Sequence, residues 1–308
     1  MDTSYSPSAV VNTNIAENSA NNESKDLGQE FLSQTPNRLV VDKIPAPIVA
    51  NDYCCADELI GQPLVTCDGS LAINLFKGIR VDINANHSIY VSMGDSKVSV
   101  SNSGQNIGVV HRFGRVFKEL VPQNNCHIES GIHLAKMCGR GITFTSLNRS
   151  LIYLVDSSGC KTTTERFRKL NHDFSLDIFN SHALSADYGR QRAFADLIRG
   201  SYEVSEEGDE KFWYFPGLRI RQHVLTGDLM ITKSYGKVVV YMNPSENSVK
   251  VNAPNLRITA TNRPDSCLSI IKPHSKDEQR VTAGFNNFRV KYGSQKAGFD
   301  ANDELVLI

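Results

Sequence analysis

The sequence predicts a mainly β protein of the α+β class, built as two tandem antiparallel β-meander units joined by one helix. Three observations lead to this prediction. From Thr66 onward, short runs of alternating apolar and polar residues are separated by Gly, Asn, Asp and Ser, which is typical of antiparallel strands joined by tight turns. The two halves of this region resemble each other, and one amphipathic stretch lies between them.

The composition sets the broad class of protein. A chain of 308 residues has room for two ordinary domains. Its 33 basic and 33 acidic residues cancel, so the whole chain has no broad attraction to nucleic acid or to an anionic membrane. No apolar run approaches the roughly 20 residues of a membrane helix, and residues 1–30 lack the pattern of a signal peptide. Seven irregularly spaced cysteines are typical of free thiols in a reducing compartment, so we expect a cytoplasmic protein without a membrane partner.

The N-terminal region is predicted to be a tail followed by a linker. Residues 1–38 are rich in Asn and Ser and hold few large apolar side chains, so we expect this segment to be disordered. Within it, Thr35 precedes a proline and fits a proline-directed kinase site, which makes it a candidate phosphosite. Residues 39–65 are predicted to be a linker, in which Leu39–Ile44 forms an edge strand before two prolines.

The first β-meander unit is predicted over residues 66–175. The turns at 67–70, 94–96 and 102–104 supply residues that tolerate positive φ, as hairpins require. Its strands are expected at Leu71–Leu75, Ile79–Ile83, Ser88–Val91, Lys97–Val100, Val109–His111, Phe113–Phe117, Ile142–Phe144 and Leu151–Val155.

The second unit, over residues 176–308, is predicted to begin with the connecting helix at Ala186–Arg199. Phe194, Leu197 and Ile198 fall on one face of this helix, and Gly200 ends it. The strands after it are expected at Gly217–Ile220, Leu229–Ile231, Lys237–Tyr241, Ser248–Val251, Leu256–Ile258, Cys267–Ile271, Phe288–Lys291 and Leu305–Leu307.

A repeat relates the two units. Three runs in the first unit are matched in the second, and the two spacings differ by one residue: Gly78–Val81, Ile89–Val91 and Lys97–Val100 correspond to Gly217–Ile220, Leu229–Ile231 and Lys237–Val240. This favours duplication of one β-meander. The alternative is that any two β-hairpins look alike.

No sequence motif predicts catalysis, so we expect a protein that is not an enzyme and has no cofactor or metal. A nucleophile elbow, a phosphate loop, a zinc-protease helix and a dinucleotide fingerprint are all missing from the sequence. Cys126, His127, Glu129, His133 and Cys138 offer zinc ligands, but alternation along a strand would scatter them over both faces. We interpret them as incidental residues of a loop.

The sharpest candidate for partner binding is the aromatic run Phe212, Trp213, Tyr214 and Phe215. Four consecutive aromatic residues in an extended segment cannot all point into one core. Trp and Tyr are common hot-spot residues at protein interfaces. The alternative is that the run is a staple that holds the predicted helix to the second sheet.

Basic and aromatic residues between 140 and 199 give a second binding hypothesis. Phosphate pairing and base stacking on one sheet face would suit a nucleic-acid strand, although most of the aromatic residues fall at core positions. The candidate contacts are Arg140, Arg149, Arg166, Arg168, Lys169, Arg190 and Arg192.

Three hairpin motifs resemble known families. Asp68–Ser70, Ile107–Phe117 and Thr226–Ile231 look like hairpins of the β-repeat regions in sperm-associated antigen proteins of the axonemal central apparatus. The order of sheet, helix and sheet is also similar to the tandem polo-box module of polo-like kinases. Either resemblance covers about residues 66–308 and implies a non-catalytic scaffold at a microtubule-based structure. The sequence has no kinase domain and matches no phosphate-binding His and Lys pair of a polo box.

The preferred hypothesis is therefore a non-catalytic scaffold or adaptor that binds a protein partner at the cytoskeleton, in a cilium, flagellum or centrosome. The alternative is a nucleic-acid-associated protein that uses residues 140–199, with the nucleus as its location.

Overall fold

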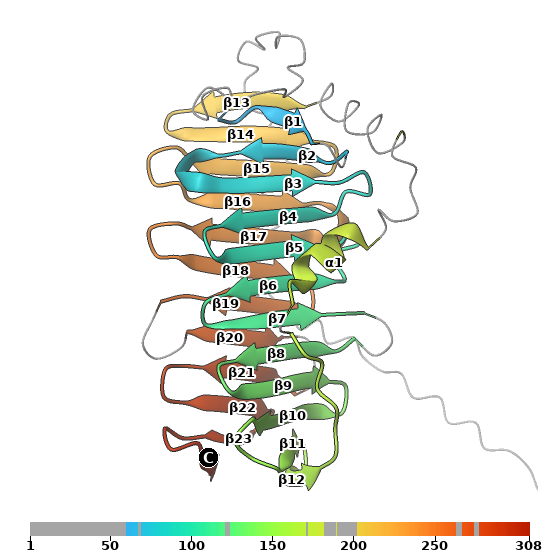
Figure 1. The fold of residues 1–308 in the computed structure, drawn as a ribbon, viewed down its shortest axis with the longest axis vertical. Coiled ribbons are helices and arrows are strands. Elements are labelled where there is room, and N and C mark those ends of the chain that lie inside the picture. The colour runs from blue at the N-terminus through green and yellow to red at the C-terminus, as the bar shows by residue number, and fades with distance from the viewer. Residues whose placement is uncertain are drawn as a thin grey trace, which may run out of the picture. The chain divides into compact units, whose positions relative to one another are not determined.

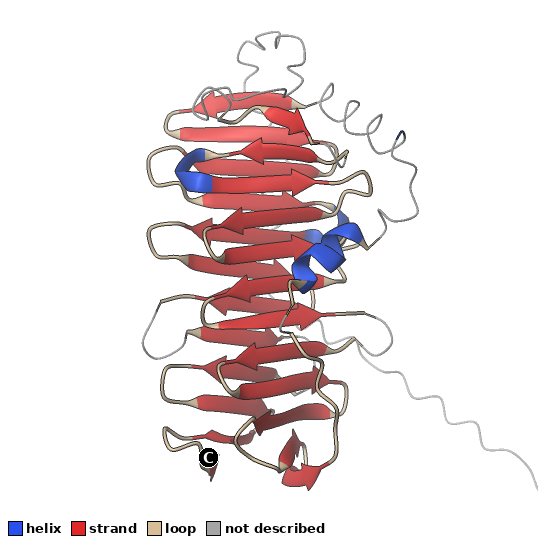
Figure 2. Cartoon of the chain, viewed as in Figure 1, coloured by secondary structure: helices blue, strands red, loops and turns tan. Residues whose placement is uncertain are grey.

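The computed structural model confirms the mainly β fold class with two antiparallel β-meanders (Figures 1 and 2). It describes residues 60–66, 69–120, 124–170, 172–181, 189, 202–262, 267–273 and 277–308. Each meander is a 12-stranded sheet in which every strand pairs with the next strand along the chain. We call the sheet of β1 to β12 sheet A and the sheet of β13 to β24 sheet B.

The strands are short and follow one another closely in both sheets. Sheet A contains β1 (Pro63–Val65), β2 (Leu71–Asn74), β3 (Ile79–Ile83), β4 (Ile89–Met93), β5 (Ser96–Val100), β6 (Ile107–His111), β7 (Gly114–Lys118), β8 (Cys126–Ser130), β9 (His133–Cys138), β10 (Gly141–Ser146), β11 (Ile152–Asp156) and β12 (Gly159–Thr163). Sheet B contains β13 (Glu203–Glu207), β14 (Glu210–Phe215), β15 (Leu218–His223), β16 (Leu229–Lys233), β17 (Val238–Asn243), β18 (Ser248–Ala253), β19 (Leu256–Ala260), β20 (Leu268–Lys272), β21 (Gln279–Ala283), β22 (Phe288–Tyr292), β23 (Gln295–Phe299) and β24 (Leu305–Leu307).

The two sheets share one hydrophobic core. Alternate residues of each strand point to opposite sides of a sheet, and the apolar set of both sheets forms a single buried cluster. Phe144 of β10 lies with its ring centroid 5.5 Å from that of Phe299 of β23. His133 of β9 stacks on Phe288 of β22 at 4.9 Å. The sheets therefore pack face to face, and each buries the inner face of the other.

Polar contacts between turns and strand ends also join the sheets. The buried Gln222 side chain accepts a hydrogen bond from the Phe76 amide at 3.0 Å and donates one to the Phe76 carbonyl at 2.9 Å. At another site, Gln279 Nε2 donates to the Cys138 carbonyl at 2.7 Å. Gly104 and Gly236 meet where two turns approach each other, and a Cβ on Gly236 would lie 2.4 Å from the Ser103 carbonyl oxygen. Both glycines have positive φ, so the sequence permits this close approach.

The strands of the two sheets run in the same order along the molecule (Figure 1). β12 contacts β23 at one end, and Trp213 of β14 bonds to Gly61, just before β1, at the other. The described residues that follow β12, 164–170 and 172–181, run back along the outer face of sheet A, and we call them the return segment. Part of this return is helix α1 (Phe174–Asn180), which packs on the outer face of sheet A over β4, β5 and β6. Leu170, Phe174 and Ile178 pack there against Phe117.

Several predicted boundaries differ from the structure or lie outside it. The structure has helix α1 at Phe174–Asn180, where none was expected. The predicted helix at Ala186–Arg199 lies outside the described residues except for Gly189, as do the 1–38 tail, Thr35 and the strand at Leu39–Ile44. The repeated runs form β3 to β5 in sheet A and β15 to β17 in sheet B, which are the third to fifth strands of each sheet. Among the described helices, none has the length and apolar character needed to cross a membrane.

Candidate functional site on the outer face of sheet B

The predicted aromatic run forms strand β14, and alternation divides it between the two faces. Trp213 and Phe215 point inward, and Trp213 is fully buried with Nε1 donating to the Gly61 carbonyl at 2.7 Å. Phe212 and Tyr214 point outward and stack at 6.2 Å. The Arg219 guanidinium lies 4.9 Å from one ring centroid and 5.4 Å from the other. Of the four residues, Tyr214 is partly exposed and the other three are buried. Trp213 is therefore a core residue.

The residues proposed to contact nucleic acid lie in several different places. Arg140 precedes β10 and Arg149 follows it, so they flank opposite ends of that strand, and Arg149 Nε donates to the Asp303 carbonyl at 3.0 Å. Arg168 pairs with Glu119 at 2.8 Å and covers the Phe117 ring. Arg166 and Lys169 are exposed in the segment after β12, whereas Arg190 and Arg192 lie outside the described residues. Phe144, Phe174 and Phe179 are buried.

A different basic surface emerges on the outer face of sheet B. The strand register aligns its outward residues in two rows that cross the sheet. The first row contains Phe212, Arg221, Met230, Tyr241, Lys250, Thr259, Ser269, Thr282, Arg289, Gly298 and Val306. The second row contains Tyr214, Arg219, Thr232, Val239, Asn252, Arg257, Ile271, Arg280, Lys291 and Lys296. From β14 onward neither of these rows, whose residues are all described, contains Asp or Glu, whereas on the edge strand β13 Glu203 continues the second row beside Tyr214.

We call the basic residues of these rows the basic face. They are Arg219, Arg221, Arg280, Arg289, Arg257, Lys250, Lys291 and Lys296. Two carboxylates next to the rows neutralise part of this charge: Glu210 pairs with Arg221, and Glu278 lies 3.2 Å from both Arg280 and Lys291.

Five side chains of the basic face form no ion pair in the part of the chain that the structure describes: Arg219, which lies against two aromatic rings, and four others. Lys250 and Arg257 lie on the neighbouring strands β18 and β19, and Arg289 and Lys296 lie on the neighbouring strands β22 and β23. All four residues are exposed. Their positive charge is therefore available to an anionic ligand.

The outer face of sheet A contrasts with this surface, because every outward-facing Lys or Arg on its described strands has a carboxylate partner. Three of these carboxylates belong to the sheet: Asp82 pairs with Arg80, Glu129 with Arg115 and Asp156 with Lys161. The other two come from the return segment and pair with lysines of β9 and β5: Glu165 with Lys136 and Asp173 with Lys97. The outward-facing cations on the described strands of sheet A are thus all paired with carboxylates of the same chain, whereas several of those on sheet B are not.

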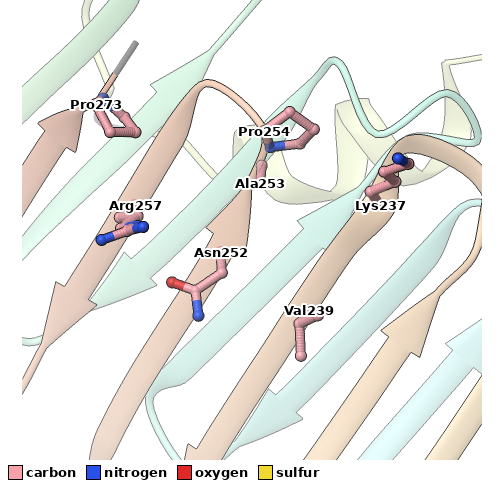
Figure 3. Close-up of a pocket in the computed structure, with 7 residues that line it drawn as sticks. All are labelled: Lys237, Val239, Asn252, Ala253, Pro254, Arg257 and Pro273. Carbon is pink, nitrogen blue, oxygen red and sulfur yellow. The ribbon is translucent and has the colours of Figure 1, made fainter. Parts of the chain in front are cut away.

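A shallow hollow of about 440 Å³ lies within the basic face (Figure 3). Val239 and Asn252 form part of its wall on β17 and β18, and Lys237 and Arg257 place positive charge beside them. Ala253, Pro254 and Pro273 complete the lining. The hollow combines a small apolar surface with two cationic side chains, which suits an anionic group attached to an apolar one.

The candidate zinc ligands lie on strands rather than in a loop, and they point in different directions. Cys126 faces the core, while His127 lies on the outer face with its Nε2 3.3 Å from a carboxylate oxygen of Glu119. Burial raises the pKa of the Cys126 thiol to about 11, so this side chain is a neutral core group. Among the described residues, no group of three or more His, Cys, Asp or Glu side chains is placed to hold a metal ion.

Ser146, His133 and Asp303 meet between the sheets, but not in the order of a catalytic triad. Asp303 accepts a hydrogen bond from Ser146 Oγ at 2.6 Å and contacts His133 Nε2 at 3.0 Å. The serine proton is therefore directed at the carboxylate, whereas in a triad the histidine takes it. This cluster joins the β9–β10 hairpin of sheet A to the turn before β24 of sheet B.

Sequence reasoning missed the basic face because its residues come from six strands over 78 positions of the chain, from Arg219 to Lys296. A signal was present in the alternation of single strands. Arg219 and Arg221 flank Ile220, and Arg289 and Lys291 flank Val290, so both basic residues of each strand lie opposite an apolar one.

Comparisons with known proteins assign no family. No protein-family model and no curated protein matches the chain. The TCP10 domain of Danio rerio CPAP, solved in complex with a peptide of Danio rerio STIL, is 10% identical with a TM-score of 0.24, and the match covers 77% of this chain and 97% of that chain. Apo AztD from Citrobacter koseri is 8% identical with a TM-score of 0.15, covering 80% and 84%. At these TM-scores, neither likeness supports a statement about fold or function.

Proposed function

We propose that this protein is a non-catalytic scaffold that binds a protein partner on the basic face of sheet B. The observation that carries the proposal is the set of four exposed, unpaired cations on that face, Lys250, Arg257, Arg289 and Lys296. A broad sheet face with unbalanced charge and a shallow hollow presents a surface suited to complementary charge on a partner.

To test this, the wild type and two triple variants are each used to capture proteins from cells. The face variant combines Lys250→Glu, Arg257→Glu and Arg289→Glu, and the control variant combines Arg140→Glu, Arg166→Glu and Lys169→Glu. Both variants change the charge equally at exposed positions. We expect a set of proteins that the wild type and the control variant capture and the face variant loses, and nuclease should not remove this set.

Two kinds of result would contradict the proposal. If the face variant captures the same proteins as the wild type, the basic face is not the docking surface. If the control variant loses them, or if nuclease releases them, the alternative hypothesis of a nucleic-acid-associated protein takes precedence.

The proposed location is the cytoplasm, at a cilium, flagellum or centrosome. What supports it is the resemblance of Asp68–Ser70, Ile107–Phe117 and Thr226–Ile231 to hairpins of axonemal sperm-associated antigen proteins. Microscopy of the tagged protein beside a centriole marker tests this part separately, and a diffuse or nuclear signal would exclude it.

A further inference from the structure

We infer that the basic face binds an acidic polypeptide segment that also carries an apolar side chain. This inference rests on the proposed function and names the chemistry of the partner. Its carboxylates pair with Lys250, Arg257, Arg289 and Lys296, and its apolar side chain lies in the hollow against Val239 and Pro254, between the charges of Lys237 and Arg257.

The covering of sheet A shows what such a complex requires. There, residues 164–170 and 172–181 of the same chain lie on the outer face and supply Glu165 to Lys136 and Asp173 to Lys97. Phe174 and Ile178 of this segment bury apolar surface beside those ion pairs. The outer face of sheet B also combines cations with apolar surface: its unpaired cations lie on the same face as the partly exposed side chains of Met230 and Val239. A second segment that combines carboxylates with an apolar side chain is its natural complement.

The side chains around the cations favour a polypeptide over a nucleic-acid strand. Strands of nucleic acid stack their bases on exposed aromatic rings. In the two rows, whose residues the structure describes in full, Tyr241 is 37% exposed, Tyr214 lies against Arg219 and Phe212 is buried.

The positions of the cations predict the spacing of the acidic groups. Lys250 and Arg257 form one pair on β18 and β19, and Arg289 and Lys296 form a second pair on β22 and β23. Three strand spacings separate β19 from β22, a distance of about 14 Å. An extended peptide covers this distance in about four residues. The segment should therefore carry two acidic groups separated by about four residues.

A synthetic probe tests the inference on the full chain. The probe is a fluorescein-labelled peptide that contains two Glu-Glu pairs. Four residues separate the pairs, and these four are one Leu and three Ser. Its controls are the same peptide with Gln in place of Glu and a labelled oligothymidylate of matched charge. Binding is measured by fluorescence anisotropy with the wild type, the face variant and the control variant. Circular dichroism confirms that each variant is folded, and single Lys250→Gln and Arg289→Gln variants replace the face variant if it is not.

We expect the Glu peptide to bind the wild type and the control variant equally, and the face variant at least about tenfold more weakly. The Gln peptide should also bind at least about tenfold more weakly. The inference is overturned if the Glu peptide does not bind, if the face variant binds it unchanged, or if oligothymidylate binds more tightly and loses affinity in the face variant. A cellular partner that the face variant loses, together with no binding of the Glu peptide, would reject this inference and leave the proposed function standing.

Discussion

At the scale of single residues, the surroundings of Trp213 show that this side chain stabilises the core. Its ring is enclosed between the sheets, and its indole N–H is satisfied by the Gly61 carbonyl at 2.7 Å. A buried indole that makes a hydrogen bond contributes both burial and a satisfied polar group.

We expect Trp213→Ala to lower the free energy of unfolding by about 3–5 kcal/mol, the usual cost of truncating a large core side chain. Urea denaturation followed by circular dichroism measures this. Tyr241→Ala, at a side chain that is 37% exposed on the outer face, is the control and should change stability little. A loss below about 1 kcal/mol for Trp213→Ala would show that the ring is not enclosed as the structure has it.

The ionisation of Asp303 should make the stability of the contact between the sheets depend on pH. Burial alone would raise the pKa of this carboxyl, but hydrogen bonds from Ser146 and His133 outweigh burial and hold the pKa below its usual range. A carboxyl with a lowered pKa stabilises the fold at a pH above its unfolded pKa of about 3.9, and that contribution is lost as the pH falls through the folded pKa.

Asp303→Asn should therefore reduce stability by about 1–2 kcal/mol at pH 7, as expected for lost hydrogen bonds to a charged group. The difference from the wild type should shrink as the pH falls below about 4. Asn tolerates the positive φ of 61° at this position, so the backbone is preserved. Urea melts between pH 2 and pH 7 test this, with Glu246→Gln as the exposed control. A difference that stays constant with pH would rule out the ionised carboxylate as its source.

At the scale of elements, helix α1 depends on a close approach to sheet A. Gly108 of β6 lies beneath the helix, and a Cβ there would lie 2.9 Å from Ile178 Cδ1 and 3.2 Å from Phe174 Cε2. The helix has seven residues, so packing rather than its own propensity must hold it.

Gly108→Ala should displace α1 and cost about 1–3 kcal/mol, as overpacking of a tight contact does. Hydrogen exchange of the amides in 174–180 should speed up at least about tenfold. Gly139→Ala is the matched control, because no atom lies within 4 Å of a Cβ at that position. Equal exchange rates in the two variants would mean that the helix does not rest on β6.

The sequence predicts strands well where inward and outward residues alternate, and less well elsewhere. Ile79–Ile83 was predicted with the bounds that β3 has, because its apolar residues recur at every second position. β13 was missed because the run Glu203–Glu207 is almost wholly polar, and a strand at the edge of a sheet can form without an apolar pattern. Helix α1 was missed because seven residues are too few for a helical period to stand out. The basic face, which runs from β15 to β23, required the register of nine neighbouring strands, which turn lengths set and local patterns do not reveal.

At the scale of the whole molecule, each sheet depends on the other. The inner face of a 12-stranded sheet is apolar along its length, and one core cluster contains residues of both sheets. A sheet exposed on that face would present a far larger apolar patch than a soluble surface normally carries. The two meanders, although consecutive in the sequence, should therefore fold and unfold together.

The only tryptophan of the chain makes this dependence measurable, because Trp213 lies in sheet B and reports its unfolding by fluorescence. Phe144→Ala removes a fully buried ring from sheet A, with an expected cost of about 3–5 kcal/mol. If the sheets unfold as one unit, the Trp213 transition should move to lower urea by as much as the transition seen by circular dichroism. Leu147→Ala, at an exposed side chain of the same hairpin region, should leave both transitions in place. A Trp213 transition that is unmoved by Phe144→Ala, while circular dichroism reports earlier unfolding, would mean that sheet B is stable without sheet A.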